Sequence, residues 1–221
     1  MAQPITDEEQ LQLLKNWWKD NGRSIVLAVG VALAVYFGWQ WWAKYQQDYA
    51  EQAAAIYTDL IGAVVVREGE TLSDDSYTTA QFLIEQLQTD YNRTIYAFNG
   101  SLLAAKLAVD KGDLAVAEEQ LTLALEYSNQ DFRPLVSLRL AKVYFAQENY
   151  DQALAVATYD AEDSFTGLFA ALRGDIHVAL DDKEAARIDY QLALASLGSD
   201  SNFQRRMVEI KLSGLGDGST P

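Results

Sequence analysis

The sequence predicts an all-α protein in which a single transmembrane helix near the N-terminus precedes an α-solenoid of paired helices. Three observations support this prediction. The 20 residues from Ser24 to Ala43 carry no charged side chain. After residue 92, small residues recur with a regular long period, and apolar residues outside the span follow the helical spacing of three to four residues. The 221 residues leave room for one domain with its own core after the span.

The uncharged segment has the length that a membrane-spanning helix requires. At a rise of about 1.5 Å per residue, a helix of residues 24–43 covers about 30 Å, the thickness of a bilayer's hydrocarbon core. Ala32-Leu33-Ala34 also satisfies the small-x-small rule for signal peptide cleavage. Because apolar residues continue past that point to Trp42, an uncleaved anchor is favoured.

Basic residues are distributed unevenly about the span and predict its direction. Lys15, Lys19 and Arg23 precede it, whereas Lys44 is the only basic residue between the span and Arg67. By the positive-inside rule, residues 1–23 are expected in the cytoplasm and the following domain on the other side of the membrane. Aromatic residues at the outer end of the span fit a membrane interface: Tyr36, Phe37, Trp39, Trp41 and Trp42.

Residues 1–23 are predicted to contain a short amphipathic helix that lies at the membrane surface, and a plain juxtamembrane helix without a binding role is the alternative. Thr6-Asp7-Glu8-Glu9 has the form of a capping box, which predicts a helix start. Asn21-Gly22 is a typical helix stop, so this helix is expected to end before the span.

Small residues form one face of the span. Gly30, Ala34 and Gly38 recur every four residues, a spacing that permits close packing against another transmembrane helix. The alternative is that these residues reflect only the high frequency of Gly and Ala in membrane helices.

The chain after the span divides into connecting helices, repeats and a C-terminal end. The helical pattern continues from Lys44 toward Val64, and a second helix is expected over Tyr77–Thr89 after the polar turn Ser73-Asp74-Asp75-Ser76. Met207, Ile210 and Leu212 suggest a closing helix with Arg205 and Arg206 exposed on it. The predicted boundaries are residues 44–92 for the connecting helices, 93–200 for the repeats, 201–213 for the closing helix and 214–221 for a flexible tail.

Three segments share a small residue, a tight turn and then an alanine. Equivalent positions lie 36 and 33 residues apart, which brackets the tetratricopeptide period of about 34 residues. Two antiparallel helices approach closely only where the facing residues are small, so these positions are predicted to mark helix crossings. The crossing positions are Ala105 with Ala117, Ala141 with Ala153, and Gly174 with Ala186.

Composition excludes several classes of partner and site. With 32 acidic against 17 basic residues the net charge is −15, and only four of the acidic residues precede the span. A domain this acidic repels phosphate backbones, so nucleic acid is not an expected partner. Because cysteine is absent, a disulfide, a thiol nucleophile and a zinc-thiolate site are excluded.

No pattern in the sequence predicts an enzyme, and we expect no catalytic residue, metal site, cofactor or small-molecule substrate. His177 is the only histidine, and Asp175 lies on another face of the same predicted helix. Packing is the expected role of His177, and a membrane-anchored hydrolase is the weakest alternative. A helical repeat domain offers its surface to other polypeptides, which favours a protein-binding role.

Several segments resemble the YfgM family, the ancillary subunit of the SecYEG translocon. They are the run Trp17–Arg23, the exit Gly38-Trp39-Gln40-Trp41-Trp42, the helix Ala53–Val64, Leu138–Val143 and Leu172-Arg173-Gly174-Asp175. The resemblance covers nearly the whole chain. It implies a single-pass protein of the inner membrane of Gram-negative bacteria, with an N-terminus in the cytoplasm and a tetratricopeptide-like domain in the periplasm.

The resemblance also implies partners. Proteins of this family associate with the SecYEG translocon and a PpiD-like periplasmic chaperone, and assist the transfer of translocated chains to periplasmic chaperones. The family brings no catalytic residue. A tetratricopeptide-type assembly factor for another envelope complex is the alternative, because it would share every feature that the residues themselves predict.

Overall fold

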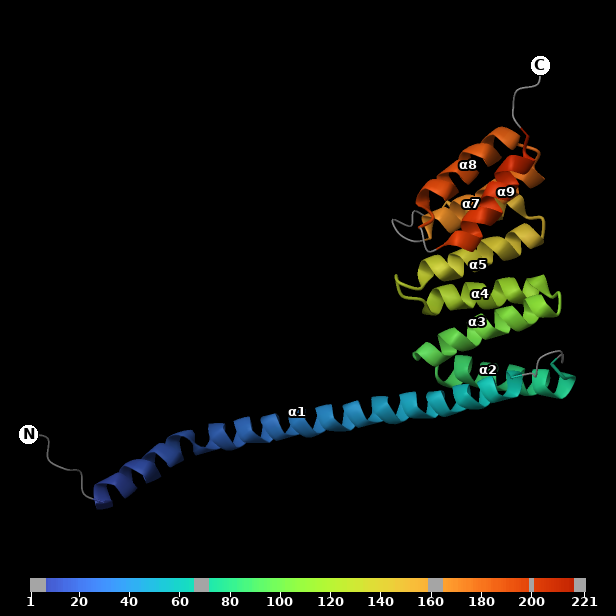
Figure 1. Cartoon of the computed structure of the whole chain (residues 1–221). Coiled ribbons are helices and arrows are strands. Elements are labelled where there is room, and N and C mark those ends of the chain that lie inside the picture. Colours follow the sequence, from blue (N-terminus) through green and yellow to red (C-terminus); the bar gives the residue numbers. More distant parts are fainter. Residues whose placement is uncertain (1–6, 66–71, 159–164, 199–200, 217–221) are drawn as a thin grey trace, which may run out of the picture. The chain divides into compact units, whose positions relative to one another are not determined.

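The computed structural model of the protein describes residues 7–65, 72–158, 165–198 and 201–216 (Figure 1). Within these ranges the chain forms nine α-helices and no strand, which confirms the predicted all-α class. The helices are α1 Asp7–Val64, α2 Asp74–Asp90, α3 Ile95–Asp110, α4 Leu114–Tyr127, α5 Arg133–Ala146, α6 Tyr150–Ala157, α7 Thr166–Ala179, α8 Lys183–Ser196 and α9 Asn202–Gly214. Two compact units make up the chain, residues 1–52 and residues 53–221.

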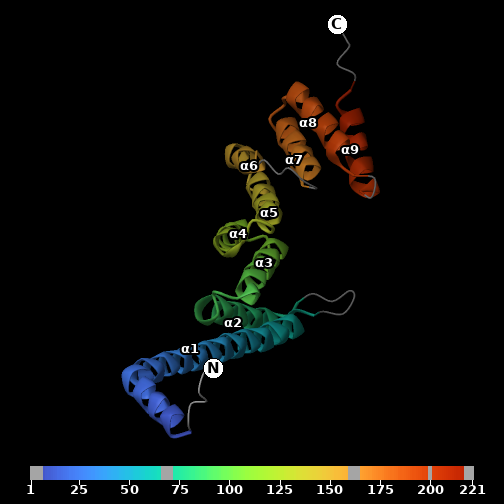
Figure 2. The ribbon, with the colours of Figure 1, turned by 90° about the vertical axis from the view of Figure 1, so that its left-hand side faces the viewer.

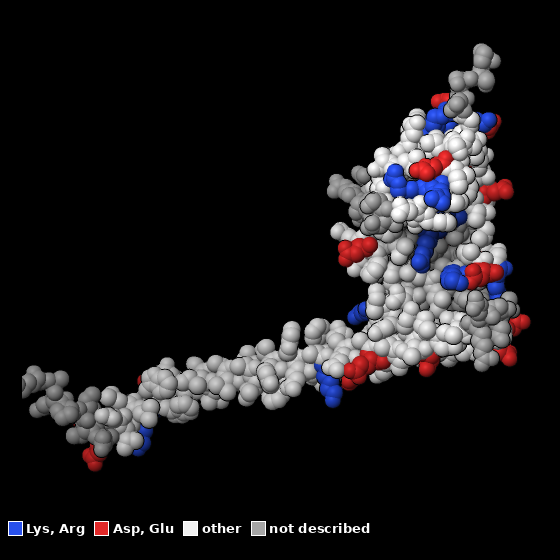
Figure 3. Space-filling view, viewed as in Figure 1, with Lys and Arg blue, Asp and Glu red and all other residues white. Residues whose placement is uncertain are grey.

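The first unit consists of the greater part of α1. Among the described helices, α1 is the one that by length and composition could cross a membrane, and its most apolar window is not buried by the rest of the chain. Figure 3 shows a long stretch of α1 without charged side chains. The helix begins at Asp7, whereas Thr6 of the predicted capping box lies outside the described residues.

The predicted helix stop at Asn21-Gly22 is wrong, because α1 is continuous through both residues. The Asn21 side-chain amide donates to the Trp17 carbonyl oxygen at 3.1 Å, and the Trp18 indole covers Gly22. A side chain that bonds a carbonyl of the preceding turn bends a helix without ending it. Figure 2 shows α1 bending near its N-terminal end.

The second unit is a stack of helix pairs in chain order, from the last turns of α1 and α2 to α7, α8 and α9 (Figures 1 and 2). Among the described residues of this unit, no helix pair has a core of its own. Each buried cluster joins neighbouring helices, and one cluster combines Ala53 and Leu60 of α1 with Ala80 and Ile84 of α2 and with Leu107 of α3. This continuous sequence of small cores is the architecture of an α-solenoid, as predicted.

The repeat is visible in the backbone of the turns. Gly112, Glu148 and Asp181 adopt positive φ values of 79°, 60° and 59°, and they lie 36 and 33 residues apart. In each turn the next residue donates its backbone N–H to the carbonyl five residues back: Asp113 to Ala108, Asn149 to Tyr144 and Asp182 to His177. The three turns have different residues at the left-handed position, but each ends one helix and begins the next with the same backbone geometry.

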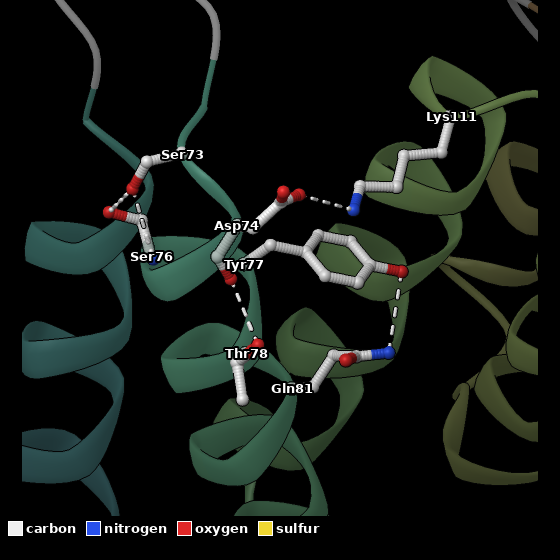
Figure 4. Close-up of polar contacts among 7 residues, drawn as sticks. All are labelled: Ser73, Asp74, Ser76, Tyr77, Thr78, Gln81 and Lys111. Atoms are coloured by element: carbon white, nitrogen blue, oxygen red, sulfur yellow. Dashed lines mark hydrogen bonds and ion pairs between the residues drawn. The ribbon is translucent and has the colours of Figure 1, made fainter.

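The start of α2 is fixed by its own cap and by the turn between α3 and α4 (Figure 4). The Ser73 hydroxyl accepts from the Ser76 backbone N–H at 3.1 Å. The Lys111 ammonium lies 3.5 Å from the centroid of the Tyr77 ring and 3.5 Å from Asp74 Oδ1. The predicted polar turn therefore does cap a helix, which begins three residues before the expected Tyr77.

The closing helix α9 is present, and Leu212 packs against the core as predicted, but the other two apolar residues named for that face do not. Val208 is only 3% exposed, whereas Met207 and Ile210 are 40% and 58% exposed. Arg205 does not lie free on the surface either, because its guanidinium donates to the carbonyl oxygens of Leu194 and Leu197 at the end of α8. These two hydrogen bonds join α9 to the end of α8, and Val208 packs in the same cluster as residues of α7 and α8.

A candidate protein-binding groove on the repeat helices

A groove of about 540 Å³ lies on the second unit, along the last turns of α1 and on α3, α4 and α5. Tyr57 of α1 and Asn99 of α3 supply polar groups to its wall. Its floor is apolar and includes Leu102, Leu103, Val109, Leu114 and Val143. A groove of this kind offers burial to apolar side chains of a ligand and leaves a few polar groups to orient it.

Three basic side chains line the groove, although the chain as a whole is strongly acidic. Lys106 forms an ion pair with Asp110 on the same helix. Arg139 and Lys142 are exposed, and neither has a hydrogen-bond or ion-pair partner within the part of the chain that the structure describes. On the face seen in Figure 3, basic and acidic side chains both lie over the stacked helices, with uncharged surface between them.

Acidic side chains gather instead on α4. Glu118, Glu119 and Glu126 line a shallow hollow along that helix. Burial raises the pKa of the Tyr144 phenol and the neighbouring Glu118 carboxylate raises it further. The basic side chains of the groove and the acidic hollow on α4 therefore form two local surfaces of opposite charge.

A second polar cluster joins the last helices of the stack. Arg173 forms an ion pair with Asp189 at 2.8 Å and donates to the Ala157 carbonyl oxygen at 3.0 Å. His177 Nε2 lies 3.5 Å from the other oxygen of Asp189. One side chain of α7 thereby connects the end of α6 with α8.

Asp175, on another side of α7, makes a separate set of contacts. It accepts from the Tyr190 hydroxyl at 2.7 Å and from the Lys211 ammonium at 2.7 Å. Burial of the ring raises the pKa of Tyr190, and the bond to Asp175 raises it further. The phenol is therefore a neutral donor, and the contacts join α7 to α8 and α9.

These two clusters show which carboxylate lies near His177, for which packing was the predicted role. As expected, Asp175 does not face His177; the nearby carboxylate is Asp189 of the next helix, and Arg173 already binds it. The sequence analysis did not identify Arg173 or Asp189 as part of this cluster. The available signal was a carboxylate at position 189 on the same helical face as Ala186, Tyr190 and Ala193. Across the described ranges, no group of three His, Asp or Glu side chains could hold a metal ion.

The six predicted crossing positions all lie in the interior of the second unit. The five alanines are no more than 3% exposed: Ala105, Ala117, Ala141, Ala153 and Ala186. Gly174 is buried, and a Cβ atom built on it would lie only 2.4 Å from Cε1 of Tyr190. That these positions set the distance between helices remains a prediction.

The predicted packing face of the span is open in the isolated chain. Gly30, Ala34 and Gly38 are exposed, and a Cβ atom at either glycine would meet no atom within 4 Å. The face has room for a neighbouring helix.

Comparison with known proteins extends over both the anchor and the repeats. The family described as a tetratricopeptide repeat-like domain matches residues 15–217. The chain is 34% identical over 216 residues to the ancillary SecYEG translocon subunit of Haemophilus influenzae, with 97% of this chain and 100% of that protein aligned. No solved structure matches the chain.

Two further relatives carry the same name. The protein of Aggregatibacter actinomycetemcomitans is 31% identical over 216 residues, which cover 97% of this chain and 100% of the relative. The protein of Escherichia coli K12 is 27% identical over 191 residues, which cover 86% of this chain and 88% of the relative. The chain therefore belongs to the YfgM family, with a tetratricopeptide repeat-like domain that follows an apolar N-terminal helix.

Proposed function

We propose that the protein is a membrane-anchored scaffold for protein interactions that associates with the SecYEG translocon. The observation that carries this proposal is the end-to-end alignment with the Haemophilus influenzae protein named as an ancillary SecYEG translocon subunit. The alignment includes the anchor as well as the repeats. The apolar α1 and the groove on α3 and α5 supply the physical means to stay at a membrane and to hold another polypeptide.

The orientation and the task of the domain form the finer part of the proposal. With Lys15, Lys19 and Arg23 before the span and Lys44 alone after it, the N-terminus lies in the cytoplasm and the repeats lie in the periplasm. There the groove assists the transfer of translocated chains to periplasmic chaperones, with a PpiD-like chaperone as a partner. This task needs binding and release and no bond-making chemistry.

Copurification tests the association with the translocon. We expect the tagged full chain, extracted in mild detergent, to recover SecY and SecE, because the anchor and its partner helices leave the membrane together. The double variant Gly30→Leu with Gly38→Leu is expected to lower this recovery several-fold, because the larger side chains prevent close packing. Val29→Leu with Val31→Leu, changes next to the small-residue face, is the matched control.

The result would also separate the two candidate functions. Consistent recovery of a different envelope complex without SecY would contradict the proposal and favour an assembly factor for that complex. Equal recovery with both double variants would remove the Gly30, Ala34 and Gly38 face from the proposal.

Cysteine labelling tests the orientation, since the chain has no cysteine of its own. In cells with a permeabilised outer membrane, we expect an impermeant maleimide to label Asp75→Cys and to leave Gln3→Cys unlabelled until the inner membrane is broken. Both chains should label after lysis, which controls for reactivity. Labelling of Gln3→Cys alone before lysis would place the repeats in the cytoplasm.

A further inference from the structure

We propose that the groove on α3 and α5 binds an acidic, amphipathic segment of a partner polypeptide, with apolar side chains on the groove floor and carboxylates at Arg139 and Lys142. The inference rests on the proposed function and specifies the partner chemistry of the same groove.

The floor determines the apolar half of the ligand. Leu102 and Leu103 are half-buried, and Val109, which lines the same groove as the buried Val143, is 45% exposed. Apolar side chains of a ligand that pack on this floor would be removed from water together with the floor. The favourable free energy of this burial scales with the buried area. Nucleic acid has no apolar surface of this form to offer, so the floor favours a polypeptide.

A comparison of equivalent positions in successive repeats shows why the carboxylates of the ligand are expected to bind at α5. Lys106, Lys142 and Asp175 each directly follow the small residue of their repeat, and Lys211 lies one further period on. Asp175 and Lys211 neutralise each other at 2.7 Å, and Lys106 pairs with Asp110. Of these four equivalent positions, only Lys142 lacks an oppositely charged partner in the described ranges.

Arg139 makes this position more strongly cationic. It lies three residues before Lys142, and side chains at that spacing are neighbours on the surface of a helix. Two like charges there repel each other and add nothing to the stability of α5. A carboxylate of a bound segment removes the repulsion, and a guanidinium offers it two parallel hydrogen bonds. The acidic surface of α4 does not reach into the groove to supply this carboxylate.

Peptide binding to the full chain in detergent micelles tests the inference. The probe is a fluorescein-labelled 16-residue helix-forming peptide with a leucine stripe flanked by glutamates. Two matched peptides replace the glutamates by lysines or the leucines by serines. We expect fluorescence anisotropy to show saturable binding of the Leu/Glu peptide only, with an affinity that falls as salt is raised, because exposed charges are screened.

Charge reversal in the groove supplies the decisive comparison. Arg139→Glu with Lys142→Glu is expected to weaken binding of the Leu/Glu peptide by at least about tenfold, because a repulsive contact replaces an attractive one. Arg133→Glu, an exposed change on the same helix outside the groove, is the control and should leave affinity unchanged. Equal melting temperatures of the variants show that folding is not the cause.

Three results would overturn the inference. They are equal binding of the Leu/Lys and Leu/Glu peptides, equal affinity of the groove variant and the Arg133→Glu control, and a change in self-association of the groove variant. The last would mean that a second acidic copy of this chain occupies the groove. Because none of these measurements involves SecY, failure here leaves the translocon association standing, and failure of copurification leaves the peptide result standing.

Discussion

Replacing Gly174 by alanine is expected to destabilise the repeat domain by about 3 kcal/mol, toward the upper end of the range for overpacked cores. The added Cβ atom would lie 2.4 Å from Cε1 and 2.5 Å from Cδ1 of Tyr190. The ring cannot move away at low cost, because Tyr190 is only 2% exposed and its hydroxyl is bonded to Asp175. In an ordinary helix the same substitution would stabilise by about 0.5–1 kcal/mol.

Thermal unfolding of the full chain in detergent, followed by circular dichroism, measures this effect. A loss of about 3 kcal/mol lowers the melting temperature of a domain of this size by roughly 6–12 °C. Gly62→Ala is the control, since a Cβ atom there meets nothing within 4 Å. If both alanine variants melted at the same temperature, the close approach of α7 and α8 at Gly174 would be refuted.

A double variant separates the clash from other effects of alanine. With Tyr190→Leu in the background, the ring that the Cβ atom would meet is absent. Gly174→Ala is then expected to cost little beyond Tyr190→Leu alone, so the two changes should be strongly non-additive. Additive losses would place the cost of Gly174→Ala elsewhere in the helix.

The repeat architecture could be predicted because it depends on local patterns that recur. Small residues 36 and 33 residues apart are visible in the sequence, and the turns between them follow the same period. Of the three left-handed turn residues, only Gly112 is of a type that predicts a left-handed conformation from the sequence. Glu148 and Asp181 adopt the same conformation without being glycine, and only their place in the period identifies them.

Other features could not be predicted because they depend on which side chains meet. Asn21-Gly22 has the composition of a helix stop, but helical residues on both sides and the covering Trp18 ring keep α1 continuous. On α9, Val208 rather than Met207 faces the core, in a rotation of the helix that also lets Arg205 bond the end of α8, and the sequence does not reveal that contact. In the groove, Lys106 and Lys142 occupy equivalent positions of two repeats. Only the structure shows that Lys106 forms an ion pair, with Asp110, and that Lys142 does not within the described residues.

Replacing Asp189 by leucine is expected to cost about 3 kcal/mol, the low end of the range for breaking a buried ion pair. The side chains of Arg173 and Asp189 are 19% and 13% exposed, so the remaining guanidinium would keep its charge with little access to water. His177 would lose its neighbouring carboxylate as well. Arg173 would still reach the Ala157 carbonyl oxygen, which is one reason to expect the low end of that range.

Asp110→Leu is the matched control for this prediction, because Asp110 forms its ion pair with Lys106 on an exposed helix surface. Exposed pairs contribute at most about 1 kcal/mol, so Asp110→Leu should melt several degrees above Asp189→Leu. Equal melting temperatures would show that Arg173 escapes to solvent. The double variant Arg173→Leu with Asp189→Leu is expected to regain much of the loss, since an apolar pair of similar volume often replaces a buried ion pair without cost. Such recovery would mean that the pair adds little net stability to the contact of α7 with α8, because the cost of removing two charges from water offsets their attraction.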